Sequence, residues 1–160
     1  MGSKARFAKE ILPIILKDKK PEQWYVEPFA GGMNVICEFG GKRIANDNNY
    51  YLIEMWKGLA NGNKYPTEIP KESIIYCDIP YQGTKQYSTS KDFNHSAFWD
   101  WCREKARQGH TIFVSEYNAP ADFECVWQKQ AKSSLSANGK IGGNKLSVEK
   151  LFKFSPTNVQ

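Results

Sequence analysis

The residues Asp78-Ile79-Pro80-Tyr81 place an acid, a proline and an aromatic ring directly after the apolar run from Ile74 to Cys77. An apolar run that stops at polar residues predicts a buried strand whose end delivers these groups to the carboxyl edge of a sheet. A carboxylate and backbone carbonyls that accept hydrogen bonds, beside a ring that stacks, suit chemistry on the amino group of a flat heterocycle. The alternative is that Asp78 caps the next segment and Ile-Pro-Tyr forms an ordinary turn.

A second candidate is the turn from Glu27 to Gly32, which follows a predicted strand at residues 24–26. Met33, Val35, Ile36 and Phe39 then recur at helical spacing, which predicts a helix before Gly40. A strand, a glycine turn and a helix form a unit in which bare backbone can approach a ligand beside a helix N-terminus. Tight turns also use glycine for steric reasons, so the glycine pair alone does not decide between the two.

A third candidate, Asp47, follows the predicted strand Arg43–Ala45 and lies twenty residues beyond Glu27. An acid at this position in doubly wound folds binds the hydroxyls of a ribose. Asp47 or Asn48 would otherwise serve as the N-cap of a helix. The spacing from the glycine turn favours ligand binding.

The elements that must position these residues alternate between strands and helices. Apolar spacing and turn residues predict a helix at 5–16 with Pro13 near its last turn, a helix at 51–59, a helix at 96–108 before Gly109 and a short helix at 122–126. They also predict strands at 74–77 and 111–114, a strand that starts at 126, and a last strand at 146–154 that closes the sheet. The polar segment 82–94 is a mobile lid or substrate-contacting loop, or a solvated connection. The segment 132–145, rich in Lys, Ser, Gly and Asn, is a loop that tracks a phosphate backbone, or a disordered segment. This order predicts one α/β domain over residues 1–160 with a mostly parallel sheet.

Composition narrows the classes of function. The net charge of +5 permits a polyanionic partner without requiring one. Four widely spaced cysteines in apolar contexts predict free buried thiols in a reducing cytoplasm, and two histidines give no zinc-site spacing, so we expect no metal. No apolar run approaches the roughly 18 residues of a membrane helix, and the N-terminus does not read as a signal peptide, so we expect a cytoplasmic protein.

Several further segments gain meaning from their order. They are Gly2-Ser3-Lys4 with its helix, Val26 to Gly32, Asn46 to Asn49, Asp78 to Tyr81, Phe98-Trp99, Ser115 to Pro120, Phe123 to Trp127 and Glu149 to Phe152. In this order they resemble the adenine-specific DNA methyltransferases, particularly the phage-type DNA adenine methylases. The resemblance implies a Rossmann-like class I methyltransferase fold that is reduced in the middle of the chain. It also implies an enzyme that uses S-adenosylmethionine, acts on DNA and releases S-adenosylhomocysteine.

The resemblance also implies roles for individual residues. The cofactor would be bound by Gly2, Ser3, Lys4, Glu27, Pro28, Phe29, Ala30, Gly31, Gly32, Asp47, Asn48 and Asp78. The catalytic motif would be Asp78, Ile79, Pro80 and Tyr81, in which Asp78 and the carbonyl of Ile79 accept from the adenine N6 amine while Tyr81 stacks on a flipped base. Lys85, Tyr87, Lys91, Lys140 and Lys145 would contact DNA.

Two features depart from the family pattern. Ile79 replaces the usual proline, but the expected acceptor there is a backbone carbonyl, which isoleucine retains. Residues 61–73 form a short loop where relatives carry a third strand and a target-recognition region. Either the chain is a natural or engineered reduced form, or a second subunit, such as a homodimer partner, supplies that surface. The alternatives to DNA methylation are an inactive cofactor- or DNA-binding protein and a methyltransferase for RNA or protein amides.

Overall fold

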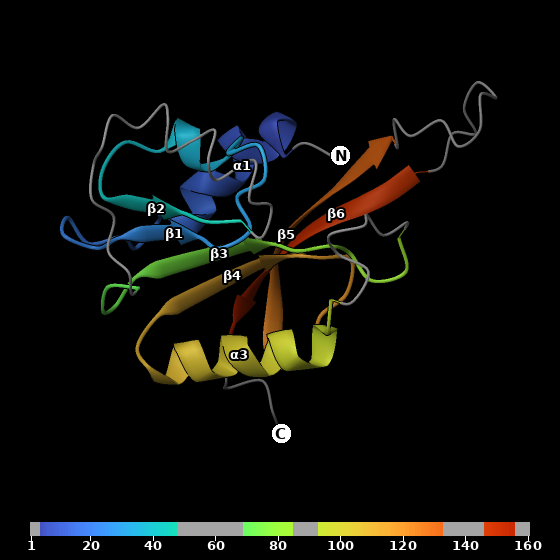
Figure 1. Ribbon diagram of the computed structural model, residues 1–160. Coiled ribbons are helices and arrows are strands. Elements are labelled where there is room, and N and C mark those ends of the chain that lie inside the picture. The colour runs from blue at the N-terminus through green and yellow to red at the C-terminus, as the bar shows by residue number, and fades with distance from the viewer. Residues whose placement is uncertain (1–3, 48–68, 85–92, 133–145, 156–160) are drawn as a thin grey trace.

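The computed structural model describes residues 4–47, 69–84, 93–132 and 146–155 (Figure 1). Several predictions lie outside these residues: the helix at 51–59, most of the loop at 61–73, and the roles of Gly2, Ser3, Asn48, Lys85, Tyr87, Lys91, Lys140 and Lys145.

The described strands form a six-stranded sheet in the order β2-β1-β3-β4-β6-β5. The strands are β1 (Tyr25–Glu27), β2 (Arg43–Ala45), β3 (Ile74–Asp78), β4 (Thr111–Ser115), β5 (Phe123–Lys132) and β6 (Leu146–Phe154). The first four in spatial order are parallel, whereas β6 runs antiparallel to both β4 and β5. The predicted α/β class with a mostly parallel sheet is confirmed for this part of the chain.

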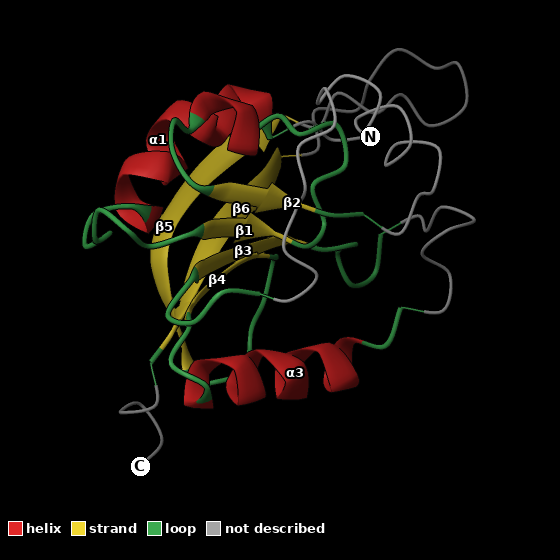
Figure 2. Ribbon diagram, turned by 60° about the vertical axis from the view of Figure 1, so that its left-hand side comes forward, coloured by secondary structure: helices red, strands yellow, loops and turns green. Residues whose placement is uncertain are grey.

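A helix covers each face of the sheet (Figures 1 and 2). Helix α1 (Ala5–Ile15) buries Phe7, Ile11 and Ile15 at a spacing of four residues, which places them on one stripe. Its Pro13 lies in the last turn, as predicted. Helix α3 (His95–Arg107) lies on the opposite face and begins at Asn94, whose side chain accepts a hydrogen bond from the amide of Ala97 at 3.0 Å.

Burial of β3 on both faces explains why its sequence is apolar at successive positions without alternation. Ile74 and Tyr76 belong to the core on the α1 side, and Ile75 and Cys77 belong to the core on the α3 side. A parallel strand that is buried on both faces reads as a continuous apolar run. The polar Asp78 ends this run at the carboxyl edge, where it pairs in register with Ser115 of β4.

Three sequence predictions about elements are wrong. The helix expected after the glycine turn is reduced to a 3-10 helix, η1 (Ile36–Glu38), because Val35, Ile36 and Phe39 enter the core without a longer helix. The short helix expected at 122–126 is instead the start of β5, which pairs with β6 from Phe123 onward and has an irregularity between Cys125 and Trp127. The last strand, β6, does not close the sheet, because it lies between β4 and β5.

All four cysteines are free, as predicted, but their burial differs. Cys77 and Cys102 are buried, whereas Cys37 and Cys125 are exposed, so the prediction of buried thiols is wrong for these two. The neighbouring Ile36 is buried in the core on the α1 side and Val126 is partly buried against it, whereas Cys37 and Cys125 are exposed. Among the helices of the described residues, none has the length and apolar character that spanning a bilayer requires.

Candidate active site

The neighbouring parallel strands β1 and β3 lie at the point where the sheet order reverses. From β1 the chain passes to β2 on one side, and it later returns to β3 on the other side. Open α/β sheets bind ligands in the crevice at such a reversal, outside the carboxyl ends of the strands. Glu27 and Asp78 are the last residues of these two strands, so the fold brings two of the predicted site residues to this position.

Asp78 lies beside a lysine from the start of the chain. The ammonium of Lys4, which directly precedes α1, is 3.5 Å from Asp78 Oδ1 and 2.7 Å from Glu149 Oε2 of β6. Burial raises the pKa of Asp78, and the Lys4 charge opposes this rise. The side chain of Asp78 is 27% exposed.

The ring of Tyr81 is fixed by contacts on several sides. Its hydroxyl donates to Glu149 Oε2 at 2.9 Å and accepts from the ammonium of Lys4. The same ammonium lies 4.4 Å from the ring centroid, and Tyr117 packs against the ring in a T-shaped arrangement at 4.6 Å. These contacts hold the tyrosine in one orientation beside Asp78.

The backbone between Asp78 and Tyr81 is also held in place. Ile79 is 3% exposed and belongs to the core on the α3 side, so the residue that departs from the family pattern contributes packing to that core. The carbonyl of Pro80 lies 2.8 Å from Nε2 of His95, at the start of α3.

Glu116, just beyond β4, holds the chain after Tyr81. Its buried carboxylate accepts hydrogen bonds from the amides of Gln82 at 2.9 Å and Tyr117 at 2.6 Å. Burial raises the pKa of Glu116, and these two hydrogen bonds oppose the rise. Glu116 therefore stabilises the segment that follows Tyr81, since its carboxylate oxygens accept from backbone amides.

The glycine turn and Asp47 meet in the structure. Gly31 has a φ of +48°, a conformation that glycine adopts without strain, and its amide donates to Asp47 Oδ2 at 2.8 Å. The amide of Ala30 donates to the carbonyl of Asn46 at 2.8 Å, which ties the turn to the end of β2. The structure therefore places the second and third candidates of the sequence in one site.

Glu27 is a buried acid inside this site. Its Oε1 accepts a hydrogen bond from the hydroxyl of Tyr25 at 2.7 Å, and the residue is 3% exposed. Burial raises its pKa from the ordinary 4.5 to about 8, because the charged form loses its hydration; the Tyr25 hydrogen bond opposes the rise, and the nearby Asp78 charge adds to it. A carboxyl of this kind favours a cationic partner, which would restore its charge.

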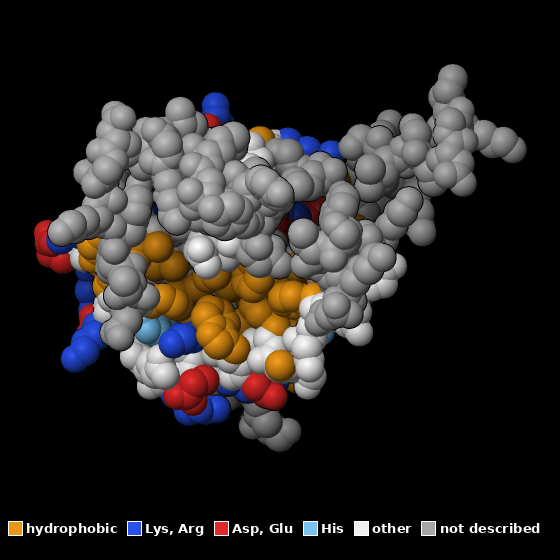
Figure 3. Space-filling view, in the orientation of Figure 1, with side chains coloured by type: hydrophobic (Ala, Val, Ile, Leu, Met, Phe, Trp, Pro, Cys, Tyr) orange, Lys and Arg blue, Asp and Glu red, His pale blue; other side chains and the backbone are white. Residues whose placement is uncertain are grey.

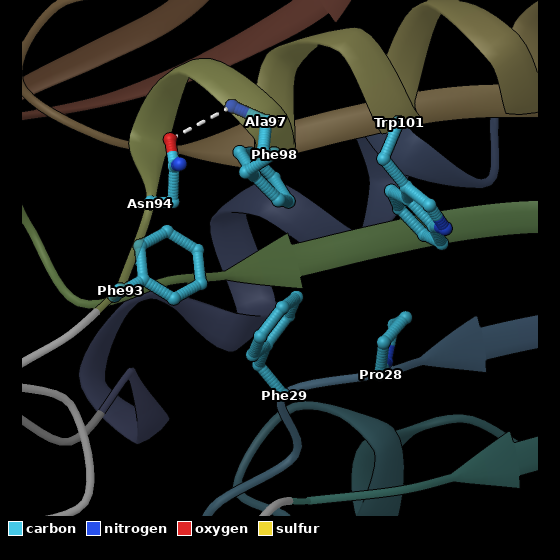
Figure 4. Close-up of a pocket in the computed structure, with 7 residues that line it drawn as sticks. All are labelled: Pro28, Phe29, Phe93, Asn94, Ala97, Phe98 and Trp101. Atoms are coloured by element: carbon cyan, nitrogen blue, oxygen red, sulfur yellow. Dashed lines mark hydrogen bonds between the residues drawn. The ribbon is translucent and has the colours of Figure 1, made fainter.

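An apolar pocket of about 320 Å³ opens next to the glycine turn. It is lined by Pro28, Phe29, Phe93, Asn94, Ala97, Phe98 and Trp101 (Figure 4). The ring of Phe29 packs edge-on against Phe93 and Phe98, each at 5.8 Å between centroids. Figure 3 shows hydrophobic side chains gathered on this side of the molecule, over the sheet and α3. Aromatic walls around an open space suit a flat ring.

Sequence reasoning missed two parts of this site. The pocket residues from Phe93 to Trp101 were not assigned to it, although aromatic residues are dense there. Glu116 and Glu149 lie within sequence motifs, but the sequence predicts no role in the site for either residue. Among the described residues, no group of three or more His, Cys, Asp and Glu side chains is arranged to hold a metal ion.

Comparison with known families bears on the first part of the chain. Residues 1–69 match the family model of the D12 class N6 adenine-specific DNA methyltransferases. The family resemblance drawn from the sequence is thereby confirmed. No curated protein matches the chain.

The methyltransferase match includes Lys4, the glycine turn and Asp47, and it ends before Asp78. The α/β sheet is compatible with a methyltransferase fold. The parts of the site beyond residue 69 are joined to the matched part by direct contacts, since Lys4 bonds both Tyr81 and Glu149.

Proposed function

We propose that this protein transfers a methyl group from S-adenosylmethionine to the N6 amine of adenine in DNA. The observation that carries the proposal is the position of Asp78-Ile79-Pro80-Tyr81 at the sheet reversal, next to a glycine turn that lies within the methyltransferase family match. The D12 family match supports adenine methylation of DNA at the level of the family.

The site has groups that fit this cofactor. The open space beside Gly31 leaves room at the turn, and the buried Glu27 would gain from a cationic ammonium group. The aromatic pocket at Phe29 and Trp101 suits the adenine ring, and Asp47 is the candidate for the ribose hydroxyls. When bound, S-adenosylmethionine supplies an electrophilic methyl group carried on a sulfonium.

The residues of the chain would then orient the target amine. Asp78 and the carbonyl of Ile79 accept hydrogen bonds from its two N–H groups, which directs the nitrogen lone pair toward the methyl group. Burial raises the pKa of Asp78, so its carboxylate is a better acceptor for the proton that the amine must lose. Tyr81 stacks on the base, which has to leave the duplex to reach this site. Alignment of this kind accounts for much of the rate in a displacement reaction.

The strand order supports the finer fold assignment. Among the described strands, a parallel set ordered β2-β1-β3-β4 is followed by an antiparallel β6-β5 pair, which is the order that we expect of a class I methyltransferase sheet inward from its outermost strand. We infer that target recognition in relatives is carried by the region that corresponds to residues 61–73 of this chain. DNA contacts by Lys85, Tyr87, Lys91, Lys140 and Lys145, and a second subunit that completes the surface, remain part of this proposal.

The test is the transfer of labelled methyl groups to unmethylated DNA of mixed sequence, with RNA and protein as parallel substrates. Asp78→Asn keeps the shape of the side chain and removes its charge, and we expect transfer to fall by at least about 100-fold. Asp100→Asn, a matched change at an exposed position of α3, should leave transfer unchanged. Equal transfer by the wild type and Asp78→Asn contradicts the proposal, and transfer to RNA or protein alone replaces DNA as the substrate.

A further inference from the structure

Glu149 is a buried acid of β6 that touches the proposed catalytic motif from a distant part of the chain. It is 8% exposed, and its Oε2 accepts both from the ammonium of Lys4 at 2.7 Å and from the hydroxyl of Tyr81 at 2.9 Å. These partners lie 145 and 68 positions away in the sequence. One carboxylate oxygen therefore joins the start of the chain, the motif and the last strand.

The contacts of Lys4 determine how accessible Asp78 is. The ammonium of Lys4 bonds Glu149 at 2.7 Å, while its distance to Asp78 Oδ1 is 3.5 Å, which is long for a charge-assisted hydrogen bond. Both Lys4 and Glu149 have side chains only 10% exposed, so water competes little for this contact. Without the Glu149 charge, the ammonium would be drawn to Asp78 and would occupy the oxygen that is needed for the target amine.

The same carboxylate sets the direction of the Tyr81 ring. Its hydroxyl is held between two charged groups, Lys4 as donor and Glu149 as acceptor, while Tyr117 borders the ring. Hydrogen bonds to charged partners are stronger than neutral ones. Loss of this acceptor would leave the hydroxyl with Lys4 as its charged partner and would weaken the restraint on the ring.

We propose that Glu149 is a positioning residue that holds Lys4 away from Asp78 and fixes the ring of Tyr81. This inference rests on the proposed methyl transfer. Glu149 does not touch the reacting atoms; it acts through Tyr81 and Lys4, and its effect on the reaction disappears when the groups through which it acts are removed.

The experiment is a double-mutant cycle on methyl transfer with Glu149→Gln, Tyr81→Phe and the double variant. We expect Glu149→Gln to lower kcat/KM by about 10- to 100-fold, mainly through kcat, because the lost bonds involve charged groups. The double variant should lose less kcat/KM than the product of the two single losses, because Tyr81→Phe removes one of the two groups through which Glu149 acts. Glu149→Asp, which keeps the charge, should recover part of the activity, and the exposed Glu124→Gln of β5 is the matched control.

A second cycle on the same variants measures the free energy of urea unfolding, which reports the contact between Glu149 and Tyr81 independently of activity. If Glu149→Gln folds poorly, the loss of unfolding free energy in Tyr81→Phe alone measures the contribution of the hydroxyl. The positioning role is overturned if the losses in kcat/KM of the two single variants multiply in the double variant. It is also overturned if the kcat/KM of Glu149→Gln is within threefold of the wild-type value. If the wild type transfers no methyl group but unfolding shows coupling between Glu149 and Tyr81, the proposed function fails while the contact stands. If neither cycle shows coupling, the positioning role itself fails.

Discussion

The buried carboxyl of Glu27 predicts an unusual dependence of stability on pH. Replacement of Glu27 by glutamine keeps the shape of the side chain and an oxygen that accepts from Tyr25, but it removes the group that titrates. Burial raises the pKa of Glu27 from 4.5 to about 8 in the folded protein. The unfolded chain keeps the ordinary value, so the two states bind different numbers of protons between these pH values.

The sign and size of the effect follow from this difference. Between pH 4.5 and about pH 8 the folded protein keeps the proton on Glu27 and the unfolded chain loses it, so the stability of the wild type falls as the pH rises. At about 1.4 kcal/mol per pH unit, the difference between the two pKa values corresponds to at most about 5 kcal/mol. The glutamine variant does not pass through this transition.

The assay is urea unfolding of the wild type and Glu27→Gln at pH 4, 6, 7 and 9. The free energy of unfolding of the variant minus that of the wild type should increase with rising pH, by several kcal/mol over this range. Glu38→Gln, at an exposed position of η1, should follow the wild-type curve. Parallel curves for the wild type and Glu27→Gln would refute the assignment of a raised pKa to this carboxyl.

Two further predictions concern the glycine turn and the pocket. Gly31→Ala should lower the free energy of unfolding by about 1 kcal/mol. This loss comes from the left-handed backbone alone, because no atom lies within 4 Å of the added Cβ. An unchanged urea midpoint would contradict this prediction and show that the turn relaxes. Phe29→Ala should weaken cofactor binding by about tenfold in calorimetry, whereas Phe154→Ala, which packs on Phe123, should not; equal affinity of both variants would remove the pocket from the cofactor site.

The strands that carry the site could be predicted from the sequence because local and tertiary demands agree there. The run from Ile74 to Cys77 is apolar at every position, and the structure buries both of its faces. Asp78 is the first polar residue after it, so the end of the strand is also marked. The reversal of the sheet between β1 and β3 then follows from the order of the parallel strands.

Other parts depend on contacts that no local pattern contains. The segment from Phe123 has short-range spacing that suits a helix, but its pairing with Phe154 makes it a strand. Glu149 has no site residue near it in the sequence. Its proposed role depends on Lys4 and Tyr81, which only the fold brings into contact with it. The aromatic pocket likewise joins Phe29 to α3, whose residues are far away in the sequence.

The most direct measurement is the mass of the nucleosides in DNA incubated with S-adenosylmethionine and either the wild type or Asp78→Asn. We expect N6-methyldeoxyadenosine in the wild-type reaction, and little or none with the variant at equal protein concentration and reaction time. Unmodified deoxyadenosine in both reactions, or equal amounts of the methylated nucleoside in both, would contradict the assignment of Asp78 as the residue that orients the adenine amine.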